Sequence, residues 1–267
     1  MRRWIFFAYG VFCHLLFVAI FAYMAGFVGN LLVPKGIDSV TAASPSMAGW
    51  APLIDMALIA MFGLQHSIMA RPWFKSRWTR IVPQPIERST YVLIAGAVTI
   101  VMMWQWRGID TVLWNVQQPI GRGLLWGLFA TGWLLVFAAS LMIDHFDLFG
   151  TRQVWLHLRG VPYTPLRFRT PLLYNRVRHP IYIGWTLAFW ATPTMTLGHM
   201  LFAGSLTLYM AIAAVIEESD LVSYFGDAYL TYQRRVPMFI PRFGDRGELS
   251  VVAPATSKPI VSQTLVR

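Results

Sequence analysis

The chain has 267 residues, of which 56% are hydrophobic and 13% are charged, about half the charged share of an average soluble protein. Its formal net charge is nevertheless +10, from 22 Lys and Arg against 12 Asp and Glu. This composition excludes a disordered chain, and the single cysteine, Cys13, excludes a disulfide scaffold. A basic nucleic-acid-binding protein would carry more Lys and fewer Leu, Phe and Trp, so we expect no nucleic-acid partner.

Long apolar runs predict an all-α, polytopic integral membrane protein. Residues 4–33 carry no formal charge, and residues 50–70, 91–106 and 121–143 are further candidate spans. Residues 180–216 contain no Lys, Arg, Asp or Glu. As one helix this run would be about 55 Å long, which exceeds a hydrocarbon core of about 30 Å. The break at Pro193 therefore predicts a C-terminal helical hairpin of two short spans, and about five to six transmembrane helices in all.

The basic residues predict the orientation of these helices. With a cytoplasmic N-terminus, 19 of the 22 Lys and Arg fall on the cytoplasmic side, and only Lys35, Arg107 and Arg122 fall outside. An excess of Lys and Arg marks the cytoplasmic loops of membrane proteins. We therefore expect a multi-pass protein with both termini in the cytoplasm. The hairpin must turn back, because a single span would place the Arg-rich tail outside.

Polar side chains collect where the predicted spans meet the cytoplasm. The hairpin begins after Arg178 and His179 and ends at Glu217 and Glu218, so these two pairs should be neighbours in space. Ionisable groups in a membrane are costly and usually functional. Their convergence predicts a pocket at the cytoplasmic face. The same face receives three further candidates, which are His66, Asp144 and His145.

Two motifs around the hairpin resemble a known family. Residues 174–184 follow the pattern Y-x-x-x-R-H-P-x-Y-x-G, and residues 217–232 follow E-E-x-x-L-x-x-x-F-G-x-x-Y-x-x-Y. Together they are similar to the cofactor-binding end of the isoprenylcysteine carboxyl methyltransferases and the related NnrU-like membrane proteins. The resemblance implies a cytoplasmic pocket for S-adenosylmethionine, released as S-adenosylhomocysteine. The cofactor-binding residues that it implies are Tyr174, Arg178, His179, Tyr182, Glu217 and Glu218.

Segments upstream of the hairpin resemble one particular group within this broad family. Residues 26–30, 34–39, 65–72 and 87–91 resemble the methanethiol S-methyltransferases of bacteria, and the similarity extends over about residues 4–244. It implies methylation of a small volatile thiol, methanethiol, to dimethyl sulfide in the bacterial inner membrane, with membrane lipid around the protein. The alternatives are another small thiol or a lipid-linked carboxylate as methyl acceptor, or a non-enzymatic NnrU-like protein.

A thiol acceptor needs a base, because the thiolate is the reactive nucleophile. The candidate catalytic residues are His145, Asp144 and His66, and histidine is favoured because its ordinary pKa is about 6.5. Our hypothesis is that Asp144 or His145 receives the thiol proton, directly or through water. No metal site is expected. We predict one membrane domain over residues 1–244, with the cofactor-binding part at 144–244, and a flexible tail at 245–267.

Overall fold

The computed structural model describes residues 1–40 and 49–241, so the predicted tail at 245–267 lies outside the described residues. Its N-terminal elements are α1 (Arg2–Gly29), α3 (Ala51–Ala70), α4 (Pro72–Trp78), η1 (Gln84–Ile86) and α5 (Glu87–Gln105). The middle elements are β1 (Val112–Asn115), α6 (Pro119–Ile143), α7 (His145–Leu148) and α8 (Thr151–Arg159). The C-terminal elements are η2 (Leu172–Asn175), α9 (Pro180–Trp190), β2 (Thr194–Thr196), α10 (Leu197–Phe225) and α11 (Asp227–Arg235).

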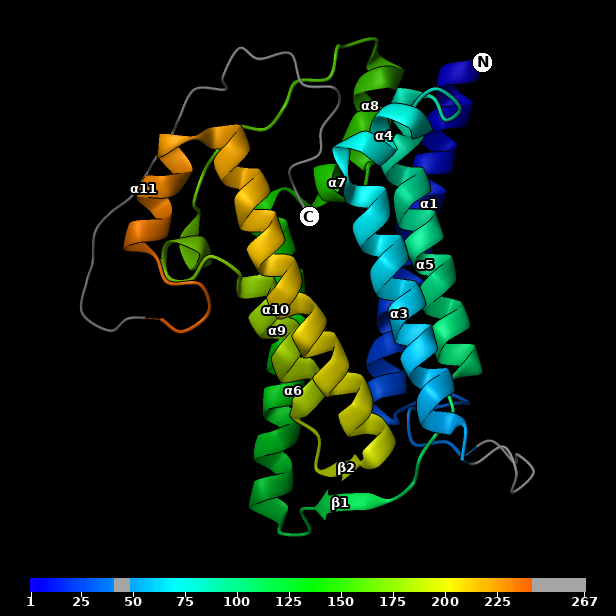
Figure 1. Ribbon diagram of the computed structural model, residues 1–267. Helices are drawn as coiled ribbons and strands as arrows, with labels where there is room; N and C mark the ends of the chain where they lie inside the picture. Colours follow the sequence, from blue (N-terminus) through cyan, green and yellow to red (C-terminus); the bar gives the residue numbers. More distant parts are fainter. Residues whose placement is uncertain (41–48, 242–267) are drawn as a thin grey trace.

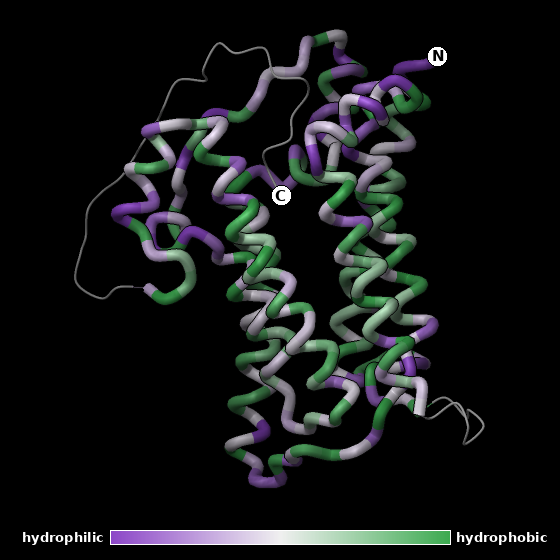
Figure 2. The backbone as a smooth tube through the Cα atoms, viewed as in Figure 1, coloured by the Kyte–Doolittle hydropathy of each residue, from purple (hydrophilic) through white to green (hydrophobic). Residues whose placement is uncertain are grey.

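Five helical segments are long and apolar enough to cross a membrane, which confirms the prediction of an all-α polytopic membrane protein. They are α1, α3, the continuous run of η1 and α5, α6, and α10. The N-terminus of α1, the short helices α4 and α8 and the last turns of α10 lie at one end of the bundle, here called the basic end (Figure 1). Hydrophobic residues dominate the middle of the long helices, and hydrophilic residues gather toward their ends (Figure 2).

The third span is longer than its apolar run. Helix α5 begins at Glu87, four residues before the predicted start at Tyr91. Glu87 and Arg88 are only 3% and 6% exposed, so the protein itself covers these charges. A helix can therefore begin with charged residues here, since their surroundings are protein rather than lipid.

The C-terminal hairpin is confirmed, but its arms are unequal. Helix α9 has 11 residues and is about 16 Å long, whereas α10 has 29 residues and is about 43 Å long, so α10 is not the short span predicted. The turn between them includes β2, which pairs antiparallel with β1 from the α5–α6 connection. This small sheet, which the sequence did not indicate, holds the tip of the hairpin at the end of the bundle opposite the basic end (Figure 1).

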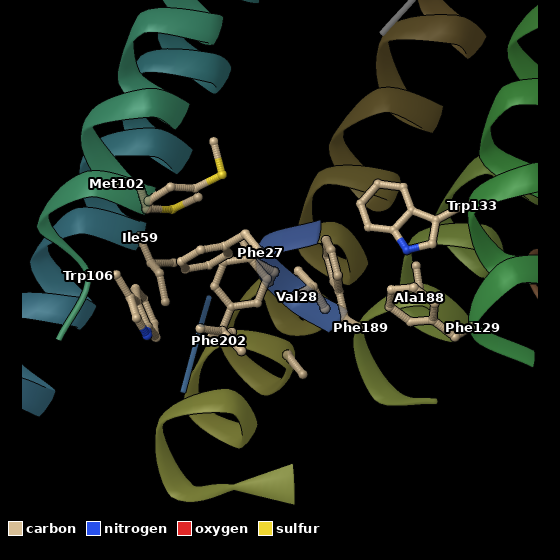
Figure 3. Packing of buried hydrophobic residues seen from close by; sticks show 14 of the residues in the cluster. Phe27, Val28, Ile59, Met102, Trp106, Phe129, Trp133, Ala188, Phe189 and Phe202 are labelled. Carbon is tan, nitrogen blue, oxygen red and sulfur yellow. The ribbon is translucent and has the colours of Figure 1, made fainter. Parts of the chain in front are cut away.

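Aromatic side chains form the core between the two halves of the bundle. Phe27, Phe189 and Phe202 lie between Trp106 at the end of α5 and Trp133 of α6 (Figure 3). The ring centroids of Trp106 and Phe202 are 5.4 Å apart and perpendicular, a favourable aromatic geometry. These contacts join α1, α5, α6 and the hairpin far from the basic end, so they support the site without lining it.

Glycines allow α6 and α9 to pack closely. A Cβ atom on Gly132 would lie 2.5 Å from the backbone nitrogen of Ala188, and one on Gly184 would lie 2.8 Å from the backbone nitrogen of Val136. Both distances are far below van der Waals contact. Small residues serve this purpose in membrane helix pairs, where close packing replaces the hydrophobic effect. This contact sets the position of α9, whose first residues belong to the candidate site.

Candidate active site

An ion-pair network joins the start of α9 to α10. The guanidinium of Arg178 donates from Nε to Glu218 Oε1 at 2.5 Å and from Nη2 to Glu218 Oε2 at 3.0 Å. His179 Nε2 lies 3.0 Å from Glu218 Oε1, and Gln233 Nε2 donates to Glu218 Oε2 at 2.9 Å. The side chains of Arg178 and Glu218 are only 10% and 8% exposed. Glu218 is thus sealed inside a network that compensates its buried charge.

Glu217 has a different environment from its neighbour. It lines a cleft, its side chain is 14% exposed, and its Oε2 accepts a hydrogen bond of 2.9 Å from the Tyr182 hydroxyl. The ring of Tyr182 stacks on His179 with centroids 5.2 Å apart and planes 9° apart. His179 Nδ1 is 3.8 Å from Glu217 Oε2. The two adjacent acids therefore divide into one buried in the network and one facing the cleft.

The local sequence explains the position of Arg178 and His179. Pro180 occupies the first position of α9, where its missing N–H is not needed, and His179 is the residue that precedes the helix. The backbone N–H groups of Arg178 and His179 donate to the carbonyls of Pro237 and Met238 at 2.9 and 3.2 Å. The Arg178 side chain also donates to the carbonyl of Val236. The segment after α11 is thereby fastened to the start of α9.

The enclosed part of the cleft has a volume of about 110 Å³, and the rest of the cleft is open to solvent. Burial raises the pKa of Tyr229 above its ordinary value, so this phenol stays neutral. The lining combines cationic, acidic and aromatic side chains from α5, α7, α10, α11 and the segment before α9. The lining residues used below are Arg88, Asp147, Tyr163, Phe168, Arg169, Tyr174, Glu217, Tyr224 and Tyr229.

One wall of the cleft is a cap segment, residues 160–171, which follows α8. Arg152 donates to Asp147 Oδ1 at 2.8 Å and to the Thr164 carbonyl at 3.1 Å, and Tyr163 donates to Asp147 Oδ2 at 3.2 Å. Phe168 packs on Phe225, Tyr229 and Tyr232 at the other side. The cap segment therefore spans the cleft from α7 to the α10–α11 corner.

Neither the cap segment nor Arg88 is marked as part of a site by the sequence alone. The signal available was a basic, proline-rich stretch with an aromatic residue on each side of Pro165, Tyr163 and Phe168. Such a stretch is typical of an ordered loop, but nothing in its pattern states which surface it covers. Arg88 belongs to a helix far away in sequence, and only the fold brings it to the cleft.

The structure brings together all six residues carried over from the family motifs. Arg178, His179, Tyr182, Glu217 and Glu218 form the network, and Tyr174 lies beside it at the cleft. The Tyr174 ring is buried and its hydroxyl donates to the Ala139 carbonyl at 3.4 Å, while its own carbonyl accepts from Tyr232 at 2.6 Å.

None of the three candidate bases, His145, Asp144 and His66, lines the cleft. Asp144 caps α7 by accepting from the backbone of Asp147, and its φ of 120° is rare outside glycine. His145 Nδ1 is 2.8 Å from the Ser140 hydroxyl, and its Nε2 is 3.3 Å from Nε2 of His14. Burial, followed by His14, lowers the pKa of His145 to about 4. Both ring nitrogens are already engaged, which makes His145 a weak proton acceptor.

The tautomers of this histidine pair follow from the hydrogen bonds. The Ser140 hydroxyl donates to the Phe137 carbonyl at 2.7 Å, so its oxygen must accept from His145 Nδ1–H. His145 Nε2 then accepts from His14 Nε2–H, and His14 Nδ1 accepts from Thr151 at 2.7 Å. The chain of neutral groups joins α1, α6, α7 and α8. It is a structural connection at the basic end.

His66, the third candidate base, lies on α3 close to a cleft residue. Its ring centroid is 5.3 Å from that of Tyr91, and Arg88, which lines the cleft, lies 5.9 Å over the same Tyr91 ring. His66 Nδ1 is buried and has no hydrogen-bond partner among the described residues. Of the two candidate histidines, His66 has a buried ring nitrogen without a hydrogen-bond partner among the described residues, whereas both ring nitrogens of His145 have partners.

Comparison with known proteins identifies the family. The chain is 48% identical over 241 residues to the methanethiol S-methyltransferase of Mycobacterium tuberculosis, covering 90% of this chain and 98% of the relative. It is 46% identical over 238 residues to the methanethiol S-methyltransferase of Crocosphaera subtropica, covering 89% and 92%. The chain belongs to the methanethiol S-methyltransferase family. Human nurim is a more distant relative, 32% identical over 181 residues, which are 64% of this chain and 68% of nurim. No protein-family model and no solved structure matches the chain.

Membership of the methanethiol S-methyltransferase family agrees with the resemblance seen in the sequence motifs. The matched region of about 240 residues includes the hairpin, the ion-pair network and the spans upstream. Neither the relatives' names nor the motifs assign a task to individual side chains. The roles below are therefore argued from the geometry.

Proposed function

We propose that this protein transfers a methyl group from S-adenosylmethionine to methanethiol, giving dimethyl sulfide. The observation that carries the proposal is the network of Arg178, His179 and Glu218, which positions Glu217 at the cleft in a chain of this family. The alternative of a lipid-linked carboxylate lacks support, because the relatives that match about 90% of the chain are named for a thiol.

The lining of the cleft suits the chemistry of S-adenosylmethionine. Glu217 would accept hydrogen bonds from the ammonium or from the ribose hydroxyls, because its carboxylate faces the cleft. The rings of Phe168, Tyr224 and Tyr229 offer stacking surfaces for adenine and cation–π contact for a sulfonium. When bound, the cofactor supplies an electrophilic methyl group on this positively charged sulfur.

The carboxylate of the cofactor needs a cation other than Arg178. The Arg178 guanidinium already serves Glu218 and two backbone carbonyls, those of Gln233 and Val236. Arg88 and Arg169 also line the cleft. We assign the carboxylate to one of these two residues, and we assign to Arg178 the task of holding α9, α10 and the segment after α11 together.

The direction of the protein in the membrane follows from its charges. The basic end carries most of the Lys and Arg, so it faces the cytoplasm of a bacterial inner membrane, with both termini on that side. The cleft is lined in part by the last turns of α10, which lie at this end, so a cytosolic cofactor can reach it. A small apolar thiol partitions into lipid, so it can reach the cleft from the bilayer.

The residues of the protein have two tasks in the reaction. The cleft must align the thiol sulfur with the methyl carbon and exclude water, because the leaving group is already activated. As the new sulfur–carbon bond forms, the old one breaks and its electron pair stays on the departing sulfur. The thiol proton needs an acceptor, and we assign this role to His66 rather than to His145 or Asp144, because His66 Nδ1 has no hydrogen-bond partner among the described residues.

The experiment that tests the function uses the full chain purified in detergent. Calorimetry should show binding of S-adenosylmethionine, and headspace gas chromatography should show dimethyl sulfide when methanethiol is added. If the protein methylates a different small thiol and forms no dimethyl sulfide, methanethiol is refuted as the methyl acceptor. Absence of cofactor binding would refute the enzyme and favour a non-enzymatic protein.

The role of His66 is tested against His145 as a matched control. His66→Ala should lower kcat at pH 7 by about 10²-fold or more, the range for loss of general base catalysis, while leaving the Kd for S-adenosylmethionine within about threefold. His145→Ala should change thermal stability more than kcat, because His145 takes part in the connection between α1, α6 and α8. Full turnover in His66→Ala would contradict the assignment.

A further inference from the structure

The corner formed by α1 and α8 at the basic end has several arginines and no acid. The sequences of the two helices contain Arg2, Arg3, Arg152 and Arg159 but neither Asp nor Glu. The helices pack on one another, with the rings of Phe6 and His157 5.5 Å apart and those of Phe7 and Trp155 5.8 Å apart. Their charges are therefore brought to one place.

Three arginines at this end have carboxylate partners among the described residues, and one of them, Arg152, belongs to this corner. Arg71 pairs with Asp220 at 2.8 Å, Arg152 with Asp147 at 2.8 Å, and Arg178 with Glu218 at 2.5 Å. No carboxylate of the described residues lies within salt-bridge distance of the remaining three arginines at the corner. These three, which we call the arginine corner, are Arg2, Arg3 and Arg159.

Arg2 and Arg3 act on the same neighbour, His157, and the Arg3 guanidinium lies beside the residue that follows Arg159. A Cβ atom added to Gly160, the residue after Arg159, would meet Arg3 Nη1 at 2.9 Å. The pKa of His157 is lowered by burial and then by Arg3 and Arg2. Such a concentration of positive charge is costly unless an anion shares it.

The surroundings of the arginine corner indicate where that anion comes from. Trp4 and Trp155 are 64% and 45% exposed, and Trp side chains of this kind lie at the boundary between bilayer and water. Arg2 lies 5.3 Å over the ring of Phe6, and Arg159 lies 5.5 Å over the ring of Trp155. The guanidinium groups of Arg2 and Arg159 thus lie against aromatic rings, next to exposed Trp side chains of the kind found at the bilayer boundary.

We propose that Arg2, Arg3 and Arg159 bind the phosphate of an anionic phospholipid in the leaflet at the basic end. Basic clusters next to membrane spans recognise anionic headgroups, and guanidinium groups can bind phosphate through two parallel hydrogen bonds. A free phosphate would gain nothing from the exposed Trp4 and Trp155, whereas acyl chains pack against them. The site is independent of the methyl-transfer proposal.

The test measures lipid binding by native mass spectrometry of the full chain in detergent. The probes are dioleoyl-phosphatidylglycerol, dioleoyl-phosphatidylcholine and inorganic phosphate. The wild type should retain phosphatidylglycerol at least tenfold more tightly than phosphatidylcholine, and inorganic phosphate at equal concentration should not displace it. The variant R2Q/R3Q/R159Q should lose this preference.

The matched control is R176Q/R234Q/R235Q, which removes the same charge from exposed positions of the C-terminal region. It should keep the lipid preference of the wild type. If both variants lose the preference for phosphatidylglycerol equally, the preference depends on net charge and the proposal is overturned. If inorganic phosphate displaces the lipid, the site binds free phosphate rather than a phospholipid. If R2Q/R3Q/R159Q fails to fold, the single variant R159Q must weaken phosphatidylglycerol binding, and an unchanged affinity would refute the site.

Discussion

Replacing the two adjacent acids of α10 one at a time should produce opposite defects. Glu218→Gln should destabilise the protein, because Arg178, His179 and Gln233 all direct donors at the lost carboxylate. A glutamine at position 218 would also place its own N–H donors opposite one of these donors, where no hydrogen bond can form. Glu217→Gln should spare stability and weaken the binding of S-adenosylmethionine, because that side chain faces the cleft.

The magnitude follows from the burial of the ion pair. Both side chains of the Arg178–Glu218 pair are at least 90% buried, and removing one partner of such a pair costs about 3–5 kcal/mol. For a domain of this size that corresponds to a loss on the order of 10 °C in the unfolding midpoint. At Glu217 a glutamine oxygen still accepts from Tyr182, so the stability should change by no more than about 1 kcal/mol.

The assay combines thermal unfolding with calorimetric titration of S-adenosylmethionine in the same detergent. Glu217→Gln should raise the Kd about tenfold, the loss of one charge-assisted contact of about 1.4 kcal/mol. The reasoning is refuted if Glu218→Gln unfolds at the wild-type temperature, or if Glu217→Gln binds the cofactor normally.

Three further predictions concern the supports of the site. The pKa of His145 is lowered from 6.5 to about 4 in the folded protein, so up to about 3 kcal/mol of stability is present above pH 6.5 and is lost as the pH falls toward 4. Unfolding scans at pH 7.5 and 5.0 should show this loss, and His145→Asn should make the loss smaller. Gly132→Ala should lower the unfolding temperature or the yield of folded protein, whereas Gly127→Ala on the same helix should not, because a Cβ there meets nothing within 4 Å. Tyr163→Phe removes the hydrogen bond to Asp147 and should accelerate cofactor dissociation several-fold in stopped-flow measurements without a large change in stability. An unchanged rate would show that the cap segment does not retain the ligand.

The sequence predicted the membrane architecture because hydropathy and charge act locally along the chain. The four upstream spans agree with α1, α3, α5 and α6 within a few residues, and the proline near the middle of the last apolar run lies in the turn of the hairpin. The start of α5 and the length of α10 were less predictable. In both places the helix includes charged residues, because parts of the chain that are distant in sequence bury them, and the local sequence does not indicate this burial.

The sequence predicted that the motif residues lie together, but it did not predict which of them is buried in the ion-pair network and which faces the cleft. Adjacent positions on a helix point about 100° apart, so Glu217 and Glu218 must face different surroundings. Which of them meets Arg178 depends on how α9 packs on α10. The same holds for the candidate bases, since a histidine's capacity to accept a proton depends on which neighbours occupy its nitrogens.

By itself, the sequence determined the class of protein, the approximate number and positions of its spans, and the motifs that mark the family, because each of these properties follows from local composition and spacing. The tertiary structure decided the rest. It buried Glu218 and left Glu217 open to the cleft, engaged both nitrogens of His145, and brought Arg88 and the cap segment to the same cavity. These outcomes depend on contacts between residues far apart in the chain, which only the packing of the helices can specify.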